Sequence, residues 1–299
     1  MAPMLALSSF LACAQNPCLE KGVVCLDPDE GPLHRRTGAR RRRGTHWRAG
    51  SGRPSASPST DHACPPINMS HMEDLWPEEH FRGPLHGPRS FFSRIPPHLL
   101  ARHADFGPCR RKVYIDIGAR TFEAGLYEMF KFYPELGGFD EFYLFEAVAG
   151  FYKLPPLDEL RTLLAPYMPH EAIATFARRH FFFQAFIGAR SQPSTVPPTI
   201  GLSDFLATTL QLRPADAVVV KMDVEGYEYT IVDTLLADGT FELIDELFVE
   251  VHYGHKKMSR MFNWCKKLPL DWWCKYTRDN ATDLYQSLRD AGVYAHHWP

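Results

Sequence analysis

The sequence predicts an α/β fold of the Rossmann-like type, with a mostly parallel sheet and helices on both faces. Short apolar, β-branched runs of strand length alternate with longer segments of helical spacing. Several of the runs end directly in an acid or a glycine. Alternation of this kind predicts right-handed βαβ units, whose ligands bind outside the carboxyl ends of the strands.

Composition divides the chain of 299 residues into three parts. Residues 1–60 are rich in Pro, Gly, Ser and Arg and have no apolar periodicity, so we expect a disordered tail. Ala12-Cys13-Ala14 resembles a signal-peptidase site, whereas residues 35–60 resemble an organelle transit peptide. A secretory, an organellar and a cytoplasmic location therefore all stay open. Residues 61–106 read as an irregular extension and residues 107–299 as the α/β domain.

The strands of this domain are expected where apolar runs reach the length of a buried strand. The last third of the run at 217–223 carries charges, but the run is otherwise the most apolar in the chain. The expected strands are Lys112–Asp116, Phe142–Glu146, Phe181–Ile187, Ala217–Asp223, Glu246–Tyr253 and Val293–His297.

Helices are expected between the strands, bounded by residues that start or stop helices. Pro134 stops the first helix, Pro166 and Pro169 interrupt the second, Ser203 caps the third and Gly239 stops the fourth. The expected helices are Phe122–Tyr133, Leu157–Arg179, Asp204–Leu210, Tyr227–Leu236 and Asp279–Ala291.

The charge balance and the cysteine spacing exclude several kinds of partner. Lys+Arg 33 against Asp+Glu 35 gives no reason to expect nucleic acid binding, and no apolar run approaches the ~18 residues of a membrane span. The seven cysteines show no paired CxxC spacing, so we expect no metal site of the zinc type. A Cys265–Cys274 disulfide is expected if the domain is lumenal. The sequons at Asn68 and Asn280 favour a secretory location only weakly.

Two candidate binding elements follow the first two strands. In the turn Asp116-Ile-Gly118-Ala119-Arg120, Gly118 allows close backbone approach, the following helix offers N–H groups, and Asp116 can meet an ammonium group. An ordinary strand-to-helix turn is the alternative. Glu146 ends the next strand, where a carboxylate can accept both ribose hydroxyls of an adenosine ligand. Its alternative is a solvated acid at the start of a loop.

Two candidate catalytic elements follow the later strands. Lys221 and Asp223 share a face at the end of the most apolar strand, so Asp223 is either a site carboxylate or the ion-pair partner of Lys221. Glu225 follows it. Glu250 and His252 share a face at the end of the fifth strand, where His252 is a general base for a hydroxyl nucleophile or a structural histidine.

These elements, in this order, resemble the FkbM-type methyltransferases. The matching strings are Tyr114-Ile-Asp116-Ile-Gly118-Ala119, Phe145-Glu146 and Lys221-Met-Asp223-Val-Glu225-Gly226. Glu250-x-His252-Tyr253 and Val293…His296-x-Trp298 resemble an uncharacterised plant branch of that family. The chain departs from the family's glycine loop at Arg120 and Phe122. The resemblance covers about residue 107 to the end.

The resemblance implies a class I methyltransferase fold and S-adenosylmethionine as the cofactor. It places Asp116, Gly118 and Ala119 at the methionine end, Glu146 at the ribose, and Asp223 and Glu225 near the transfer site. The implied reaction is O-methylation of a small-molecule or glycan acceptor. Two alternatives stay open: a catalytically decayed Rossmann-like module, and a nucleotide-sugar glycosyltransferase with Asp223 and Glu225 as a metal-binding acid pair. The acceptor and the oligomeric state cannot be read from the sequence.

Overall fold

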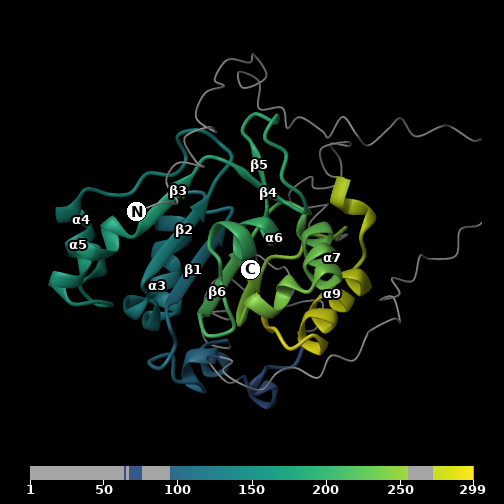
Figure 1. The fold of residues 1–299 in the computed structure, drawn as a ribbon, viewed down its shortest axis with the longest axis horizontal. Helices are drawn as coiled ribbons and strands as arrows, with labels where there is room; N and C mark the ends of the chain where they lie inside the picture. Colours follow the sequence, from purple (N-terminus) through teal and green to yellow (C-terminus); the bar gives the residue numbers. More distant parts are fainter. Residues whose placement is uncertain (1–63, 65–66, 76–94, 255–271, 299) are drawn as a thin grey trace, which may run out of the picture. The chain divides into compact units, whose positions relative to one another are not determined.

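The computed structural model describes residues 64, 67–75, 95–254 and 272–298, and it confirms the predicted α/β fold. The predicted disordered tail, residues 1–60, lies outside the described residues. Six parallel strands form the central sheet in the order β3-β2-β1-β6-β7-β8 (Figure 1). These strands are β1 (Lys112–Ile117), β2 (Glu141–Phe145), β3 (His180–Phe183), β6 (Ala217–Met222), β7 (Glu246–Val249) and β8 (Tyr294–His297).

The strand order reverses between β1 and β6, which are neighbours at the centre of the sheet. From β1 the chain moves outward through β2 to β3 and then returns to β6, on the other side of β1. Parallel sheets of this topology bind ligands at the carboxyl ends of the strands beside the reversal point. A ligand-binding site is therefore expected at the turns that follow β1, β2, β6 and β7.

Helical segments connect the parallel strands. The break between α4 and α5 confirms the interruption predicted from Pro166 and Pro169, and Gly239 ends α7 with φ 83°. The main helical segments are η5 (Glu123–Tyr127), α3 (Glu128–Phe132), α4 (Leu157–Leu164), α5 (His170–Arg178), α6 (Leu202–Asp204), η7 (Phe205–Thr209), α7 (Glu228–Asp238) and α9 (Arg278–Asp290). Shorter 3₁₀ turns are η2 (Met69–His71), η3 (Pro96–His98), η4 (Leu100–Arg102), η6 (Pro134–Gly138), η8 (Thr240–Leu243) and η9 (Trp272–Lys275).

Alternate residues of the strands build two separate hydrophobic cores, one on each face of the sheet. In β1, Val113, Ile115 and Ile117 pack in the core that contains side chains of α7 and α9. Tyr114, between them, packs in the core that contains side chains of α3, α4 and α5. Because successive side chains of a strand point to opposite faces, helices on both faces follow from this division. In Figure 1, helices α4 and α5 lie to the left of the labelled strands of the central sheet, and helices α7 and α9 lie to their right.

Three predicted elements differ from the structure. The run at 181–187 was expected as one strand, but it divides into β3, which pairs with β2, and β4 (Phe186–Gly188), which pairs with β5 (Thr199–Gly201) in a separate two-stranded sheet. The sequence carries one signal of the break, because the polar residue Gln184 interrupts the apolar run between the two strands. Ser203 does not cap a helix, because α6 already begins at Leu202. The fifth strand ends at Val249, before His252.

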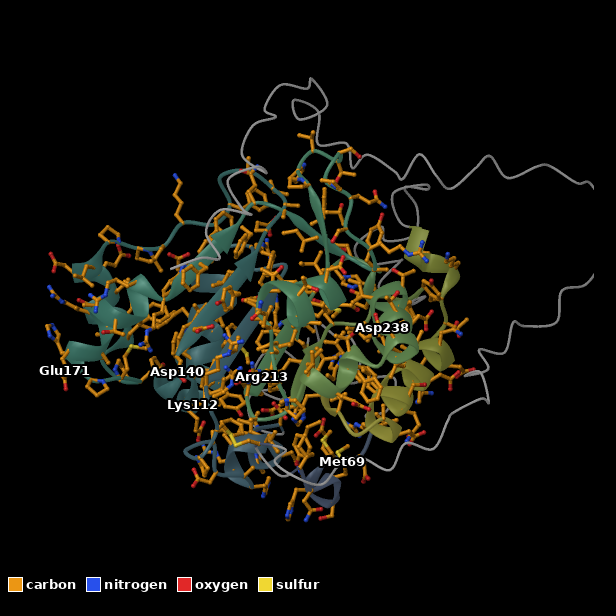
Figure 2. All side chains as sticks on the ribbon, viewed as in Figure 1. Met69, Lys112, Asp140, Glu171, Arg213 and Asp238 are labelled. Carbon is orange, nitrogen blue, oxygen red and sulfur yellow. A yellow bond between two sulfur atoms is a disulfide. The ribbon has the colours of Figure 1, made fainter. Side chains whose placement is uncertain are left out.

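The extension at 61–106 is tied to the domain covalently. Cys64 forms a disulfide with Cys109, just before β1, and the backbone N–H of Cys64 donates to the carbonyl of Pro214 at 2.8 Å. Disulfides of this kind are typical of oxidising compartments. Cys274 is also disulfide-bonded, whereas Cys265, its expected partner, lies outside the described residues. Figure 2 shows Met69 of the extension below the amino ends of the strands.

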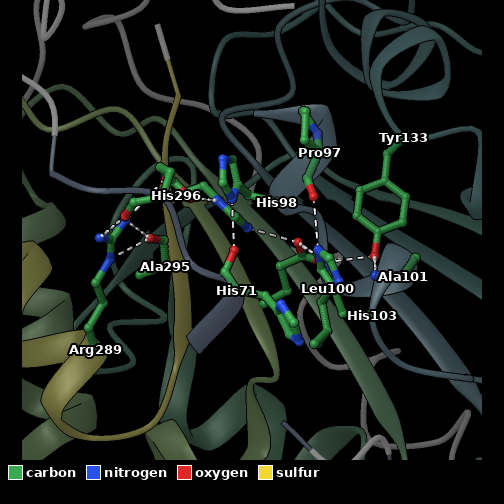
Figure 3. A network of polar contacts seen from close by, with 12 residues as sticks. His71, Pro97, His98, Leu100, Ala101, His103, Tyr133, Arg289, Ala295 and His296 are labelled. Carbon is green, nitrogen blue, oxygen red and sulfur yellow. Dashed lines mark hydrogen bonds and ion pairs between the residues drawn. The ribbon is translucent and has the colours of Figure 1, made fainter. Parts of the chain in front are cut away.

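The extension also completes a buried polar network at the amino end of β7 (Figure 3). The two ring nitrogens of His296 lie 2.9 Å from Glu73 Oε2 and 3.0 Å from Glu246 Oε1. Tyr133 donates to Glu246 at 2.7 Å, and Arg289 pairs with Glu73 at 3.1 Å. Every ionic group of the network thus has an oppositely charged partner, which is what burial of charge requires.

Within the described residues, no helix is long and apolar enough to cross a membrane.

Candidate functional site

The turn after β1 rests directly on the turn after β6. Gly118 has φ 81°, and a Cβ atom at this position would lie 1.9 Å from the carbonyl oxygen of Asp223. Any side chain would collide with this backbone, so glycine is required here. The sequence predicted that the backbone at Gly118 approaches a ligand; in the structure its close neighbour is the protein's own backbone at Asp223. The two turns are thereby locked together at the reversal point of the sheet.

The end of β2 occupies the N–H groups of the same turn. Gly118 and Ala119 both donate to the carbonyl of Phe145, at 3.0 and 2.9 Å. Arg120, which has a left-handed φ of 54°, donates to Glu146 Oε2 at 3.0 Å. All three N–H groups of the turn itself therefore already have acceptors within the protein.

Glu146 is held firmly but is not enclosed. Its second oxygen, Oε1, accepts a hydrogen bond from the backbone N–H of Val148 at 2.7 Å. The residue is half-buried at the carboxyl end of β2. Each oxygen of an ionised carboxylate can accept two hydrogen bonds, and each of these accepts one from the backbone. Glu146 is therefore fixed in orientation and keeps acceptor capacity on its exposed side.

Asp116 lies behind the turn and does not reach solvent. It is fully buried, and its Oδ1 lies 3.2 Å from Nζ of Lys221, its neighbour in the register of β1 and β6. Burial raises the pKa of Asp116, although Lys221 acts to lower it. The sequence predicted that Asp116 meets the ammonium group of a ligand, whereas the ammonium group beside it in the structure is that of Lys221. The burial of Asp116 does not support the expectation that it contacts a cofactor.

The contact between Lys221 and Asp116 also decides whether Asp223 is the ion-pair partner of Lys221. The Lys221 ammonium also donates to the carbonyl of Gly118 at 2.7 Å, so it stabilises the turn as well as Asp116. Burial lowers the pKa of Lys221, but the charges of Asp116 and Asp223 outweigh this and raise it. In the described part of the chain, the carboxylate in ion-pair contact with Lys221 is that of Asp116. The ion-pair alternative for Asp223 is therefore wrong.

The loop after β6 turns sharply towards the start of α7. Glu225 has a left-handed φ of 52°, and Gly226 follows with φ 99°. A non-glycine residue in this region costs of order 1–3 kcal/mol and persists only where the surroundings hold it, often at functional sites. The side chain of Glu225 remains 78% exposed. The strained residue is thus an accessible carboxylate at the reversal point of the sheet.

A buried acid fixes the orientation of His252. Glu228, in the first turn of α7, is fully buried, and its Oε1 lies 2.6 Å from His252 Nδ1. The same oxygen accepts from the N–H of Val224 at 3.3 Å. Nδ1 also lies 3.2 Å from the carbonyl oxygen of Glu250, which can only accept a hydrogen bond, so Nδ1 carries the ring proton and the lone pair lies on Nε2.

The other nitrogen of His252 faces three carboxylates. Nε2 lies 3.2 Å from Glu225 Oε2, 3.8 Å from Asp223 Oδ1 and 3.9 Å from Glu250 Oε1. The donor atoms of Asp223, Glu225 and His252 all lie within 4.8 Å of one another. The structure therefore brings together the three residues predicted to be catalytic, although they come from two separate loops. Such a group can accept a proton or hold a cation.

Sequence reasoning missed Glu228, although the pattern contained a signal for it. Glu228 stands at the start of the series Ile231, Val232 and Leu235, at the spacing that places residues on one face of a helix. These three neighbours are buried hydrophobic residues. An acid on the apolar face of a helix needs a buried partner. Phe122 is one of the two residues at which the sequence differs from the glycine loop that it resembles. It is fully buried in the core, so it does not occupy the outer side of the turn.

A hollow of about 300 Å³ opens at the opposite edge of the sheet. Its guanidinium and carboxylate groups pair across it, for example Arg111 with Glu141 at 3.3 Å. It lies where the strands begin, away from the reversal-point turns, so we do not regard it as the functional site. Its lining residues are Arg110, Arg111, Asp140, Glu141, Arg179 and Phe181.

Comparisons with known proteins find no matching family model, no similar curated protein and no similar solved structure. The chemistry of the site therefore stands on its own geometry. That geometry combines Glu146, a fixed and half-exposed acid after β2, with a carboxylate–histidine group that consists of Asp223, Glu225 and His252. Both lie at the carboxyl ends of the strands of one parallel sheet.

Proposed function

We propose that this chain is an S-adenosylmethionine-dependent methyltransferase that acts on a hydroxyl group of a small-molecule or glycan acceptor. The observation that carries the proposal is the placement of Glu146. Its carboxylate is fixed by two backbone N–H groups at the carboxyl end of β2, beside the reversal point, and it keeps an exposed side. An acid in this position of a parallel sheet suits the two ribose hydroxyls of an adenosine ligand.

The occupied turn favours a ligand without phosphate groups. Pyrophosphate sites at strand-to-helix turns use free backbone N–H groups. Here Gly118, Ala119 and Arg120 donate to the end of β2 instead. S-adenosylmethionine has no phosphate, so it does not require these donors. The turn therefore supports this cofactor over a nucleotide sugar.

The carboxylate–histidine group would serve the acceptor side of the reaction. Bound S-adenosylmethionine would supply an electrophilic methyl group. The acceptor hydroxyl must lose its proton, and Asp223 and His252 are the two candidate proton acceptors. Glu228 holds the ring of His252, which places Nε2 towards Asp223 and Glu225. A fixed ring shortens the search for the reactive geometry, from which much of the acceleration of such displacements comes.

Isothermal titration of the full chain with S-adenosylmethionine tests the proposal. We expect saturable binding at one site, and Glu146→Gln should weaken it about 10- to 100-fold, which corresponds to the roughly 1.5–3 kcal/mol of hydrogen bonds to a charged group. Glutamine keeps one acceptor oxygen, so the turn should survive. Glu159→Gln, an exposed acid on α4, is the matched control and should bind as the wild type does.

The same titrations separate the alternatives. If a nucleotide sugar with manganese binds and S-adenosylmethionine does not, the chain is a glycosyltransferase and the proposal fails. If neither ligand binds to a chain that melts cooperatively, the decayed module is the correct interpretation. If binding is equal in wild type and Glu146→Gln, Glu146 has no role at the ribose.

A further inference from the structure

We propose that Asp223, Glu225 and His252 hold one divalent metal ion. The sequence predicted no metal site under the methyltransferase interpretation, because its histidines and cysteines lack ligand spacing. The tertiary structure creates the spacing by bringing the loop after β6 to the loop after β7. Binding of the ion is a property of these residues alone, whereas its role in methyl transfer rests on the proposed function.

The distances between the donor atoms match a single coordination sphere. Two ligands bound at about 2.1 Å to one ion lie roughly 3.0 Å apart when adjacent and roughly 4.2 Å apart when opposite. His252 Nε2 lies 3.2 Å from Glu225 Oε2 and 3.8 Å from Asp223 Oδ1. The donor atoms that all lie within 4.8 Å of one another are those of Asp223, Glu225 and His252, so these three residues form the candidate ligand set. Only small side-chain movements are needed to enclose an ion.

His252 is prepared as a ligand by its other nitrogen. Metal-bound histidines commonly donate their second ring N–H to a carboxylate, which fixes the tautomer and the direction of the lone pair. Glu228 makes this contact at 2.6 Å. It is fully buried, and its Oε2 has no hydrogen-bond partner among the described residues, so this acid is retained in the core at a cost in desolvation. Holding a metal ligand in place accounts for that cost.

The carboxylates are arranged to meet a cation from the solvent side. Asp223 is 29% exposed and Glu225 is 78% exposed, whereas His252 is buried. Like charges at this separation repel one another, and a cation among them converts the repulsion into attraction. The left-handed backbone of Glu225 places its side chain in this group at an energetic cost. An ion held here keeps an open side for a second molecule.

The donor set selects the kind of ion. Carboxylate oxygens are typical of sites for Mg²⁺, Ca²⁺ and Mn²⁺, whereas imidazole is typical of transition metals. Two carboxylates with one imidazole therefore favour a divalent transition metal of the Mn²⁺ type. Within the proposed function, the open side would bind an acceptor through a hydroxyl oxygen, and acceptors with two neighbouring oxygens would bind best. Coordination lowers the pKa of a bound hydroxyl, so with the ion in place Asp223 and His252 act as ligands and the acceptor's proton passes to water instead of to them.

Manganese titration followed by electron paramagnetic resonance tests the site directly. The full chain is first treated with a chelator, and Mn²⁺ is then added alone, because bound ions lose the sharp signal of the free ion. We expect one ion per chain. Asp223→Asn, Glu225→Gln and His252→Gln should each weaken binding at least 10-fold, and Glu228→Gln should weaken it about 10- to 100-fold. Glu171→Gln, an exposed acid on α5, should have no effect.

Several results would overturn the inference. One is the absence of Mn²⁺ binding up to millimolar concentration in a folded chain; another is binding that the ligand variants leave unchanged. Glu225 is largely exposed, so its variant stays informative even if the buried His252 variant fails to fold. Titration of the chelator-treated chain with S-adenosylmethionine keeps the two proposals apart. Cofactor binding without metal binding refutes only the metal site, and the reverse refutes only the methyltransferase.

Discussion

A buried histidine with carboxylates around it lies near each end of strand β7: His296 near the amino end and His252 beyond the carboxyl end. The two groups differ in whether their carboxylates are buried or reach solvent. Near the amino end, Glu73 and Glu246 contact both nitrogens of His296, and all three residues are buried. Beyond the carboxyl end, Glu228 contacts one nitrogen of His252, while the other faces Asp223 and Glu225, which reach solvent. The same chemical groups thus form a closed network at one end and an open one at the other.

This difference indicates that a candidate site is identified by the solvent exposure of the carboxylates around a histidine, and not by the presence of the histidine itself. A closed network has satisfied all its donors and acceptors and serves the fold. In the open one, the carboxylates of Asp223 and Glu225 beside His252 reach solvent. The sequence offers no such distinction, because both histidines lie in or after apolar strands. The predictions below test whether the two ends behave as differently as their surroundings suggest.

The largest effect is expected for Asp223→Asn at the open end. The substitution keeps the shape and removes the charge, so methyl transfer should fall by roughly 10²–10⁴-fold, the range for a lost acid–base group. The melting temperature should change little, because Lys221 pairs with Asp116. Transfer of a labelled methyl group to a panel of hydroxylated acceptors measures the first effect, and thermal melting measures the second. A strongly destabilised variant would return Asp223 to a structural role.

Lys221→Met should mainly affect stability. It leaves Asp116 buried without its cation, and breaking a buried pair in this way costs about 3–5 kcal/mol. Urea unfolding measures the loss. The double variant Asp116→Asn with Lys221→Met should recover part of it, because the stranded charge is then also removed. If the single variant unfolds at the wild-type urea concentration, the pair does not hold the turn.

Loss of the Cys64–Cys109 disulfide should weaken the closed end, because this bond ties the extension that supplies Glu73. The two cysteines are 45 residues apart, and a loop of that length corresponds to about 4 kcal/mol in the chain-entropy model. We expect the double variant Cys64→Ser/Cys109→Ser to melt well below the wild type. Cofactor titration of the same variant is the internal control, since the open end should be unaffected. Equal melting temperatures would show that the extension contributes little.

The closed end should also make stability depend on pH. Burial lowers the pKa of His296, but Glu73 and Glu246 outweigh it and raise the pKa from 6.5 to about 9. The folded protein therefore binds a proton that the unfolded chain releases above pH 6.5. This contribution is complete below pH 6.5 and is lost as the pH rises through about 9, with a total on the order of 3 kcal/mol.

Urea unfolding at several pH values between 6.5 and 10 measures this loss. The slope should be close to 1.4 kcal/mol per pH unit in the middle of the range. His296→Gln, which cannot titrate, should show a flatter profile. A wild-type profile that is already flat would mean that His296 is not held in its charged form.

The sequence predicted the architecture well because the fold depends on local periodicity. The alternation of apolar runs with helical spacing yielded all six strands of the parallel sheet, and Pro166, Pro169 and Gly239 marked helix boundaries correctly. The prediction failed where the local signal is weak. A single polar residue, Gln184, separates β3 from β4 in an otherwise apolar run, and the change of pairing partner makes the break plain.

The site was predicted in composition but not in its contacts. Asp223, Glu225 and His252 were identified one by one, since polar residues at strand ends are visible in a linear pattern. Their convergence was not predicted, and neither was the support that Glu228 provides. The partner of Lys221 was not identified either, because the sequence offered only Asp223, two residues away, as an alternative, whereas Asp116 is the neighbour of Lys221 across the sheet.

By itself, the sequence determined the order of strands and helices, the edge of the sheet that carries polar residues, and the identity of most of those residues. These depend on side-chain period and on the rule that parallel strands expose their carboxyl ends at one edge. Only the tertiary structure decided which charges are neutralised inside and which face solvent. Pairing and burial arise between residues far apart in the chain, such as Glu73 with His296 or Glu228 with His252, and a charge becomes structural or chemical according to what surrounds it.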